Sequence, residues 1–356
     1  MKAWQENIRK VVPYTPGEQP NKPGMIKLNT NENPYPPSPL VARALQEMDD
    51  DSLRLYPDPT AASLTGAIAK RYGVSQDQVF VGVGSDDVLA ISFLTFFNSE
   101  KPIFFPDITY SFYPVWAELY RIPYETKALR EDFSIDPKDY YAENGGVDFP
   151  NANAPTSRYE SLDLIEDILC HNQDVIVIVD EAYIDFAGES ALSLLDKYEN
   201  LLIVQTFSKS RSMAGMRIGY AIGSPQLIRA MNDVKYSFNS YTMNRTSLAA
   251  GSAAIEDEDY FRECVGRIKK TRDEAEKKFA RLGFSYPEPG ANFIFVTHPA
   301  IHAKDLFTAL REANIYVRYF DKPRINEYLR VTIGTDEQMN RLFDFLESYI
   351  REHRGE

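Results

Sequence analysis

Val175-Ile-Val-Ile-Val179 and Leu201-Leu-Ile-Val-Gln205 are the two stretches that decide the fold of this chain of 356 residues. Both are nearly continuous apolar runs rich in β-branched residues, which is the pattern of strands buried on both faces of a sheet. A third such run spans 218–222, and segments with helical periodicity lie between the runs. This alternation predicts an α/β fold, a three-layer sandwich in which helices cover a mostly parallel sheet.

The two ends of the chain have a different character. Residues 13–39 carry eight prolines, a density that excludes helix from most of the stretch and predicts an extended arm across the protein. Residues 256–282 read as a long charged helix, and shorter strand and helix patterns follow it. We therefore predict a large domain over 41–240, and a smaller α+β domain over 241–356 that is joined by the arm at 1–40.

Composition limits the partners and the compartment. Lys and Arg number 39 against 52 Asp and Glu, a net charge of −13, which argues against nucleic acid as a partner. Two cysteines, Cys170 and Cys264, are too few for a disulfide framework. The N-terminus lacks the apolar core of a secretory signal, and no uncharged apolar run reaches about 18 residues. We expect a cytoplasmic protein that does not span a membrane.

Two of the predicted strands end in residues that carry chemistry. Asp180 follows the first run directly, and Ser208-Lys209 follows the second. Asp180 alone would more often cap a turn, and Lys209 alone could be a solvated loop residue. However, the carboxyl ends of parallel strands meet at one edge of a sheet, where ligands bind. The pair therefore predicts an acid and an amine in the same crevice.

A third strand leads into a glycine-containing turn, Gly82-Val-Gly84-Ser85-Asp86, before a helix. Ser85 or Asp86 could be no more than a helix cap. Alternatively, the glycines and the helix N-terminus present backbone N–H groups to a phosphate. The turn has neither the lysine of a P-loop nor the third glycine of a dinucleotide fingerprint, so those two ligand classes are disfavoured.

Pyridoxal phosphate is the cofactor whose needs these residues match together. It requires an amine for its aldehyde, an anion beside its ring nitrogen, donors for its phosphate and an aromatic face on its ring. Lys209 is the candidate amine, which would hold the cofactor as a Schiff base, and Asp180 is the candidate anion. The other cofactor candidates are the phosphate donors Ser85, Ser208 and Arg217, the helix-start residue Asp86, and Tyr110 for stacking on the ring.

The chain resembles the fold-type I aminotransferases, and within them the histidinol-phosphate aminotransferase family, over nearly its whole length. The set Asp180, Ser208, Lys209 and Arg217 is specific for the aminotransferase superfamily. The strings at 28–34 (Leu-Asn-Thr-Asn-Glu-Asn-Pro) and 330–335 (Arg-Val-Thr-Ile-Gly-Thr) point to the narrower family. Further matching segments lie at 56–59, 82–86, 107–113, 179–183, 206–209 and 214–220.

The resemblance implies roles around the cofactor. Lys209 would also move the substrate proton once the substrate has displaced it from the cofactor. Tyr183 would form a hydrogen bond with the ring hydroxyl. Tyr56 would reach the cofactor phosphate of the neighbouring subunit, which implies a homodimer with shared sites. No metal is expected.

The resemblance also implies where the substrate binds. Arg330 would grip the anionic end, because a planar guanidinium suits carboxylate or phosphate. Arg318 is a second candidate for the same anion, with a solvated strand residue as the alternative. Asn29 and Tyr14, from the N-terminal arm, complete the predicted substrate-binding residues.

One motif departs from the family pattern. The usual Asn-Pro-Asn-Asn-Pro-Thr-Gly is here Asn151-Ala-Asn153-Ala154-Pro-Thr-Ser157. Ala154 replaces the asparagine that in the family bonds the ring oxygen. Asn153 is the candidate to supply that amide from one position earlier, and Ser157 in place of glycine suggests an altered turn.

The implied activity is that of a histidinol-phosphate aminotransferase in L-histidine biosynthesis. A small-molecule amino donor, L-histidinol phosphate, and a 2-oxo acid, 2-oxoglutarate, would exchange an amino group by a ping-pong mechanism. An aromatic amino acid aminotransferase and a phosphothreonine decarboxylase share the same skeleton and stay open as alternatives. A non-catalytic ligand-binding module is a remote alternative, supported only by the altered motif.

Overall fold

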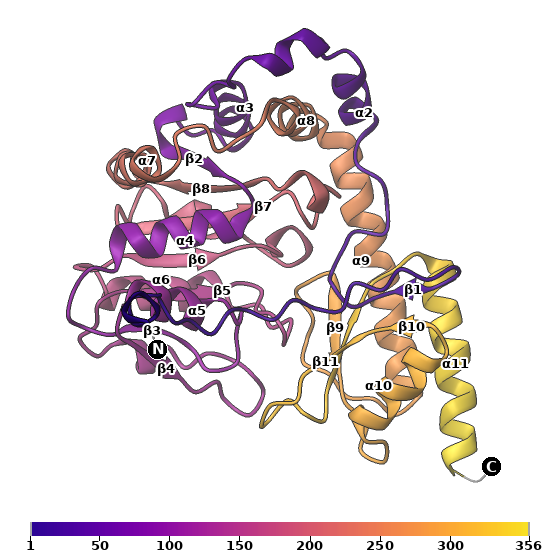
Figure 1. Ribbon diagram of the computed structural model, residues 1–356. Helices are drawn as coiled ribbons and strands as arrows, with labels where there is room; N and C mark the ends of the chain where they lie inside the picture. The colour runs from indigo at the N-terminus through magenta and orange to yellow at the C-terminus, as the bar shows by residue number, and fades with distance from the viewer. Residues whose placement is uncertain (1, 355–356) are drawn as a thin grey trace.

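A seven-stranded sheet forms the centre of the larger unit in the computed structural model, which describes residues 2–354 (Figure 1). The pairs from β7 to β4 are parallel, whereas β8 runs antiparallel to both of its neighbours. The mostly parallel sheet predicted from the sequence is therefore confirmed. Its order is β2 (Val79–Gly82), β8 (Gly219–Gly223), β7 (Leu201–Thr206), β6 (Val177–Asp180), β5 (Val147–Pro150), β3 (Ile103–Pro106) and β4 (Tyr124–Lys127).

Helices cover both faces of this sheet, which confirms the three-layer sandwich (Figure 1). One face packs against α4 (Ser85–Phe96), α5 (Tyr113–Tyr120) and α7 (Pro225–Phe238). The other face packs against α6 (Leu162–His171), α3 (Ala62–Tyr72) and α8 (Arg245–Glu256). Every residue of β6 and β7 is buried, because each strand has a helical layer on both sides. This is why their sequences are apolar without alternation.

The smaller unit is built from short strands and three helices. β9 (Phe293–Val296), β12 (Leu329–Thr332) and β11 (Arg318–Tyr319) form an antiparallel sheet, and β1 (Ile26–Lys27) pairs in parallel with β10 (Ile315–Tyr316). The chain at 315–319 thus contributes two short strands to different sheets. The helices are α9 (Glu258–Arg281), α10 (Ala303–Glu312) and α11 (Asp336–Arg354). Within residues 2–354, no helix is long and apolar enough to cross a membrane.

The N-terminal arm crosses between the two units, as predicted (Figure 1). After the short α1 (Ala3–Glu6), the chain has no helix until α2 (Pro39–Gln46). Leu28 connects the arm to the smaller unit, because its N–H donates to Tyr316 at 2.7 Å and its carbonyl accepts from Thr332 at 3.0 Å. Six 3₁₀ turns complete the described part of the chain: η1 (Asp50–Arg54), η2 (Gln76–Gln78), η3 (Pro137–Tyr140), η4 (Ile184–Phe186), η5 (Ala191–Leu194) and η6 (Ala214–Met216).

The domain division at 41–240 and 241–356 stays a prediction, and its ends at 1 and 355–356 lie outside the described residues. Helix α8 packs on α2 and α3, in one apolar cluster with Val81 and Ile222 of the large sheet. This packing favours a boundary at the junction of α8 and α9. Helix α9 then runs from the larger unit into the smaller one (Figure 1).

An acid lies in the middle of the buried strand β5. Asp148 has no exposed surface, and neither of its carboxylate oxygens has a hydrogen-bond partner among the described residues. It lies opposite Ile178 of β6, on the sheet face that packs against α4 and α5. Burial, and next the charge of Asp180, raise the pKa of Asp148 well above its ordinary value. Burial in this strand therefore favours the neutral form of the side chain.

We predict that Asp148→Asn becomes more stable than the unchanged chain as the pH rises. The unfolded chain releases this proton near pH 4 while the folded chain keeps it, so folding loses up to about 1.4 kcal/mol per pH unit above pH 4 until the folded pKa is passed. Asparagine does not titrate, so the variant does not lose this stability. The free energy of unfolding, measured with urea between pH 4 and pH 8, tests the prediction, with the exposed Asp196→Asn variant as control. A stability difference that does not change with pH would show that Asp148 is not neutral in the folded protein.

Candidate active site

Two adjoining cavities lie where the parallel strands end. The first, here called the Asp180 cavity, has a volume of about 230 Å³ and is lined by Asp180, Lys209, Ser85, Ser208 and Arg217 among others. The second, here called the arginine cavity, has a volume of about 310 Å³ and is lined by Arg318 and Arg330 among others. Both cavities share a group of lining residues: Gln19, Thr30, Asp86, Tyr110, Ala154, Tyr183 and Lys209. They form one continuous site.

Asp180 ends β6 and reaches the first cavity from the sheet. It is only 4% exposed. Its Oδ2 accepts a hydrogen bond from the Tyr113 hydroxyl at 2.9 Å, and its Oδ1 accepts one from the backbone N–H of Ala182 at 3.2 Å. Burial raises the pKa of Asp180 to about 6, although both hydrogen bonds oppose the rise. Asp180 therefore caps the turn that follows β6, one of the two roles weighed for it from the sequence, and it also faces the cavity.

Lys209 enters the same cavity from the loop after β7. Its Nζ donates to the carbonyl of Thr30 at 3.2 Å, and lies 5.7 Å from the centre of the Tyr183 ring. The amide of Asn33 donates to the backbone carbonyl of Lys209 at 3.0 Å. The arm therefore fixes both the side chain and the backbone of this lysine. The sequence did not assign Thr30 or Asn33 to the site.

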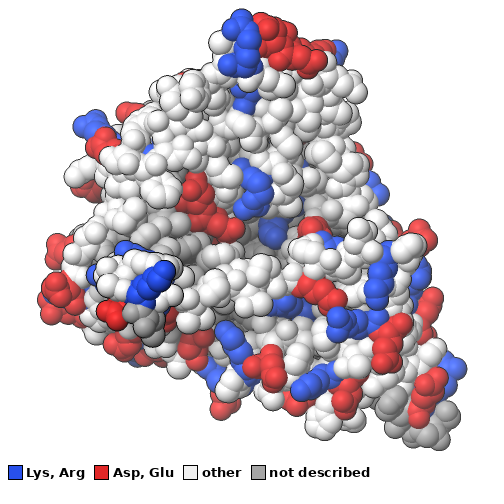
Figure 2. Space-filling view, viewed as in Figure 1, with Lys and Arg blue, Asp and Glu red and all other residues white. Residues whose placement is uncertain are grey.

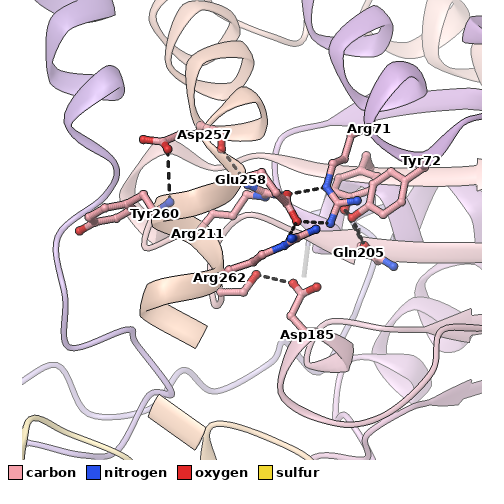
Figure 3. Close-up of polar contacts among 12 residues, drawn as sticks. Arg71, Tyr72, Asp185, Gln205, Arg211, Asp257, Glu258, Tyr260 and Arg262 are labelled. Atoms are coloured by element: carbon pink, nitrogen blue, oxygen red, sulfur yellow. Dashed lines mark hydrogen bonds and ion pairs between the residues drawn. The ribbon is translucent and has the colours of Figure 1, made fainter. Parts of the chain in front are cut away.

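A polar cluster lies behind the loop that follows β7, among residues that line neither cavity (Figure 3). The Ser210 hydroxyl donates to Asp185 of η4, and Arg211 donates to a backbone carbonyl of α8 at 2.7 Å. Beside them, Glu258 of α9 pairs with Arg71 of α3 at 2.7 Å. Burial raises the pKa of Asp185, although the hydrogen bond from Ser210 acts to lower it. The loop is thus attached to η4 and α8 on its outer side, next to the ion pair that joins α3 and α9.

The start of α4 forms the third wall of the Asp180 cavity. Gly84 has a φ of +86°, and a Cβ there would lie 2.4 Å from the Arg217 guanidinium. A Cβ on Gly219 of β8 would lie 2.3 Å from the N atom of Ser85. Only glycine permits these approaches. They leave the helix N-terminus, Ser85 and Arg217 open to the cavity, an arrangement that suits a phosphate.

Asp86 connects two of the predicted cofactor residues. It accepts a hydrogen bond from the Tyr110 hydroxyl at 2.7 Å and pairs with Arg217 at 3.3 Å. Tyr110 lines both cavities, where its ring was expected to stack. Ser208 lines the first cavity, and its hydroxyl accepts a hydrogen bond from Thr206 at 3.0 Å. The structure thus brings all four residues to one site.

Tyr183 has a partner that the sequence did not indicate. Its hydroxyl accepts a hydrogen bond from the amide of Asn31, 152 residues away, at 2.8 Å. Asn31 is held in turn by Thr332 of β12 and by Asn292, whose amide donates to the Asn31 carbonyl at 3.0 Å. The polar run at 28–34 was the available signal, but only Asn29 was assigned from it. Which asparagine of this run contacts the Tyr183 hydroxyl depends on the path of the arm.

The altered motif departs from expectation at two positions. Asn153 lines neither cavity, because its amide group donates inward to the Ile108 carbonyl at 2.9 Å and to the Thr156 hydroxyl at 2.8 Å. The structure therefore does not bring the predicted amide to the site, and the methyl group of Ala154 lies there instead. Ser157 keeps a φ of +66°, the region that favours glycine. Its hydroxyl donates to the Phe293 carbonyl at 3.0 Å, so the turn is retained and bonded to β9.

Arg330 and Arg318 face the arginine cavity from adjacent strands, at positions paired across β12 and β11. Arg330 donates to the carbonyl of Asn29 at 2.9 Å, and its buried Nε has no partner. Neither arginine forms an ion pair with a carboxylate within residues 2–354. Burial lowers the pKa of Arg330, and the nearby charge of Arg318 adds to this effect. Two unpaired guanidinium groups in one cavity suit an anion.

The arm supplies the remaining wall of this cavity. Asn29 is buried, its amide donates to the Glu18 carbonyl at 2.7 Å, and its Oδ1 has no partner. The Tyr14 ring stacks on Phe112 with centroids 4.1 Å apart. Both predicted residues line the arginine cavity.

Tyr56, like Asn153, is a predicted residue that lines neither cavity. It lies after η1, is 76% exposed and stacks on Tyr241 with centroids 4.6 Å apart.

The Asp180 cavity suits a small aromatic ring that carries a phosphate. A carboxyl group with a pKa of about 6 faces it from β6, and an amine faces it from the loop after β7. The N-terminus of α4 and Arg217, which follows η6, form its third side. The surrounding surface carries scattered charges of both signs, with basic and acidic side chains meeting at the hollow between the two units (Figure 2). The positive groups are therefore local to the site in an otherwise acidic chain.

Comparisons with known proteins agree with this geometry. Residues 23–346 match the family described as aminotransferase class I and II. A relative from Lactococcus lactis subsp. cremoris, named histidinol-phosphate aminotransferase, is 51% identical over 349 residues, which cover 98% of both chains. One from Dechloromonas aromatica, named histidinol-phosphate aminotransferase 2, is 53% identical over 347 residues, covering 96% of this chain and 98% of that protein.

Solved structures have the same fold. The histidinol-phosphate aminotransferase of Sinorhizobium meliloti, in complex with pyridoxal-5'-phosphate, superposes with a TM-score of 0.84 at 24% identity, covering 92% of this chain and 91% of that one. The enzyme of Clostridium acetobutylicum gives 0.84 at 21% identity, covering 92% and 100%. From the family match and the relatives at half identity over nearly the full length, this chain belongs to the class I and II aminotransferases, and among them to the histidinol-phosphate aminotransferase family.

Proposed function

We propose that this chain transfers an amino group between L-histidinol phosphate and 2-oxoglutarate, forming imidazole-acetol phosphate and L-glutamate in L-histidine biosynthesis. One observation carries the proposal: the cavity that contains Asp180 and Lys209 is continuous with a cavity that contains two unpaired arginines. The first suits pyridoxal phosphate, and the second suits a substrate with an anionic end. Relatives that are 51% and 53% identical bear the corresponding name.

Pyridoxal phosphate, when bound, supplies an aromatic ring that withdraws electrons from the reacting carbon of the substrate. Lys209 Nζ would hold its aldehyde, and the Asp180 carboxylate would keep the ring nitrogen protonated. The N–H groups at the start of α4, with the hydroxyls of Ser85 and Ser208, would bind the phosphate. Arg217, which pairs with Asp86 at 3.3 Å, would be a further phosphate donor.

Other side chains orient the ring and move the proton. The Tyr183 hydroxyl would donate to the ring oxygen, and the Asn31 amide holds that hydroxyl in place with a hydrogen bond of 2.8 Å. No amide at position 154 supports this contact, so Tyr183 would carry it. Lys209 Nζ, freed by the substrate amine, would take the proton from the amino-bearing carbon of the substrate and act as the proton carrier of the reaction.

Arg330 and Arg318 bind the phosphate of histidinol phosphate in one half of the reaction and a carboxylate of 2-oxoglutarate in the other. A guanidinium group can bind either anion with two parallel hydrogen bonds. Asn29 fixes Arg330, because its backbone carbonyl accepts a hydrogen bond from Arg330 Nη2 at 2.9 Å. The aromatic rings of Tyr14 and Tyr110 form the wall beside which the imidazole lies.

A homodimer is part of this proposal. A set of exposed apolar side chains gathers near η1 and the end of α7, here called the η1 patch: Leu53, Leu55, Tyr56, Tyr236, Phe238 and Tyr241. Arg245 holds the backbone of this segment, since it donates to the Tyr56 carbonyl at 2.7 Å. A second copy on this patch would bury it and bring Tyr56 to the partner's cofactor phosphate.

We also propose a cytoplasmic location. Both cysteines are free thiols: Cys170 is exposed and Cys264 is buried. Free thiols are typical of reducing compartments.

The decisive test of the substrate is a comparison of amino donors. We expect kcat/KM for histidinol phosphate to exceed those for phenylalanine and aspartate by about a hundredfold or more, because phenylalanine has no phosphate for the two arginines and aspartate also has no ring for the wall that Tyr14 and Tyr110 form. Equal values would instead indicate an aromatic or general aminotransferase. Arg330→Met should lower kcat/KM for histidinol phosphate by about 10- to 100-fold. If Arg318→Met keeps the kcat/KM of the unchanged chain, Arg318 is a solvated strand residue that does not bind the substrate anion.

The role of Lys209 is tested by borohydride reduction followed by mass measurement. We expect the unchanged chain to gain the mass of the cofactor permanently, and Lys209→Ala to gain nothing. Transamination should fall by about 10²–10⁴-fold or more in that variant, because the proton carrier is lost with the anchor. The exposed Lys197→Ala variant serves as the matched control and should retain both properties. A cofactor adduct that survives in Lys209→Ala would assign the anchor to another lysine.

Shared sites are tested by mixing two defective chains. Lys209→Ala and Tyr56→Ala each disable a site, but in a mixed dimer one of the two sites contains both original side chains. We expect co-refolded chains to recover activity that neither variant shows alone, and sedimentation to give a dimer. Mixtures that stay inactive although mixed dimers form would place Tyr56 and Lys209 in the same subunit's site, against the geometry proposed here.

A further inference from the structure

We propose that Arg324 is a positioning residue: by holding Asp107 and the carbonyls of Leu129 and Arg130, it sets the distance between the two substrate arginines and the opposite wall of the site. The inference rests on the proposed function, because it takes the anionic end of the substrate to bind at Arg318 and Arg330.

Arg324 lies in the loop that joins the two arginine-bearing strands. This loop, residues 320–328, leaves β11 two positions after Arg318 and enters β12 one position before Arg330. Any shift of the loop therefore moves both ends from which these arginines project. Neither Arg324 nor Asp107 lines either cavity, so this influence on the substrate is indirect.

The guanidinium of Arg324 contacts three groups of the larger unit. Nη1 donates to Asp107 Oδ2 at 2.9 Å, while Nη2 donates to the carbonyls of Leu129 at 2.6 Å and Arg130 at 3.0 Å. The other oxygen of Asp107 accepts from the Leu129 N–H at 2.9 Å. The planar fork of an arginine can satisfy such a set from one position, whereas the ammonium of a lysine cannot.

The backbone around Arg324 indicates that this placement is maintained by tertiary contacts. Arg324 has a φ of +68°, a conformation that costs an L-residue free energy and persists where the surroundings require it. The next residue, Ile325, is 3% exposed and lies in the apolar cluster of the larger unit. Tyr328 stacks on Phe295 at 4.5 Å and meets the edge of Phe133 at 5.4 Å. These apolar contacts dock the loop, and the arginine fixes its direction.

Asp107 transmits the contact to the opposite wall. It follows β3 directly, and its N–H donates to the Lys127 carbonyl at the end of β4 at 2.9 Å. Thr109 and Tyr110 come two and three residues later and line the arginine cavity. The contact between Arg324 and Asp107 thus joins the wall that carries Tyr110 to the strands that carry the substrate arginines. A change in the distance between these walls would displace the arginines from the substrate anion and so weaken substrate binding, while the reacting groups stay in place.

The charge of this pair contributes little by itself. The side chains of Arg324 and Asp107 are 38% and 29% exposed, so water screens the ion pair. Arg324 therefore acts through the geometry of its three simultaneous hydrogen bonds, and not through its charge. This exposure also leaves the position open to a small cation from solution.

The experiment compares Arg324→Met, Arg324→Lys and Arg324→Ala with the unchanged enzyme loaded with cofactor. We expect KM for histidinol phosphate and for 2-oxoglutarate to rise about tenfold in all three, with kcat within about threefold, because the binding wall is displaced while the reacting groups stay on the larger unit. The Kd of pyridoxal phosphate should not change, since Asp180, Lys209 and Arg217 are not part of the displaced loop. Added guanidinium ion should lower the raised KM of Arg324→Ala, but not that of Arg324→Met, whose side chain fills the space.

Asp107→Asn is the second variant, and Arg43→Met, which removes an exposed arginine from a surface pair, is the control. We expect the first to reproduce the rise in KM and the second to change nothing. Lower thermal stability with both KM values unchanged would overturn the proposal and leave Arg324 a purely structural role. An unchanged enzyme inactive with histidinol phosphate would overturn the proposed function instead. The half-reaction with glutamate, whose carboxylates use the same arginines, would then decide the role of Arg324 by the same change in KM.

Discussion

A carboxyl group buried at the end of β6, beside an amine that follows β7, is the constraint on which the rest of this structure depends. The register of the two parallel strands places Asp180 opposite Val204, so both strands end at one edge of the sheet. Burial of Asp180 is unfavourable for its charged form, and its pKa of about 6 expresses that cost. Tyr113 and a backbone N–H offset part of it. A cationic ring nitrogen would offset the remainder, which links the fold to its cofactor.

The substrate half of the site depends on a different constraint, the joining of two units by segments far apart in sequence. Asn31 of the arm bonds Tyr183 of the larger unit, and Thr332 of the smaller unit holds Asn31. Arg330 is likewise held by the carbonyl of Asn29. The arm therefore acts as a common support for cofactor and substrate residues. Without it, the arginine cavity would lack one wall.

Net charge and local charge have opposite signs here, and each has its own consequence. The net charge of −13 acts over long distances and disfavours polyanions. Arg217, Arg318 and Arg330 act at short range: among residues 2–354, Arg318 and Arg330 have no carboxylate partner, and Arg217 pairs with Asp86. A small anion can thus bind within an acidic protein, because screening limits the reach of the surrounding charges.

The sequence by itself determined the central strands and the residues at their ends. β6 and β7 could be predicted because both faces of each strand are buried, whereas β5 was missed because Asp148 interrupts its apolar pattern and β4 because its side chains are mostly exposed. The tertiary structure alone decided which polar side chains face the site. Asn153 turns inward and Asn31 takes a place beside Tyr183, because the direction of an amide depends on which carbonyls and hydroxyls the folded chain brings near it. Local sequence sets backbone preference and burial, but hydrogen-bond partners that lie 152 residues apart exist only once the chain has folded.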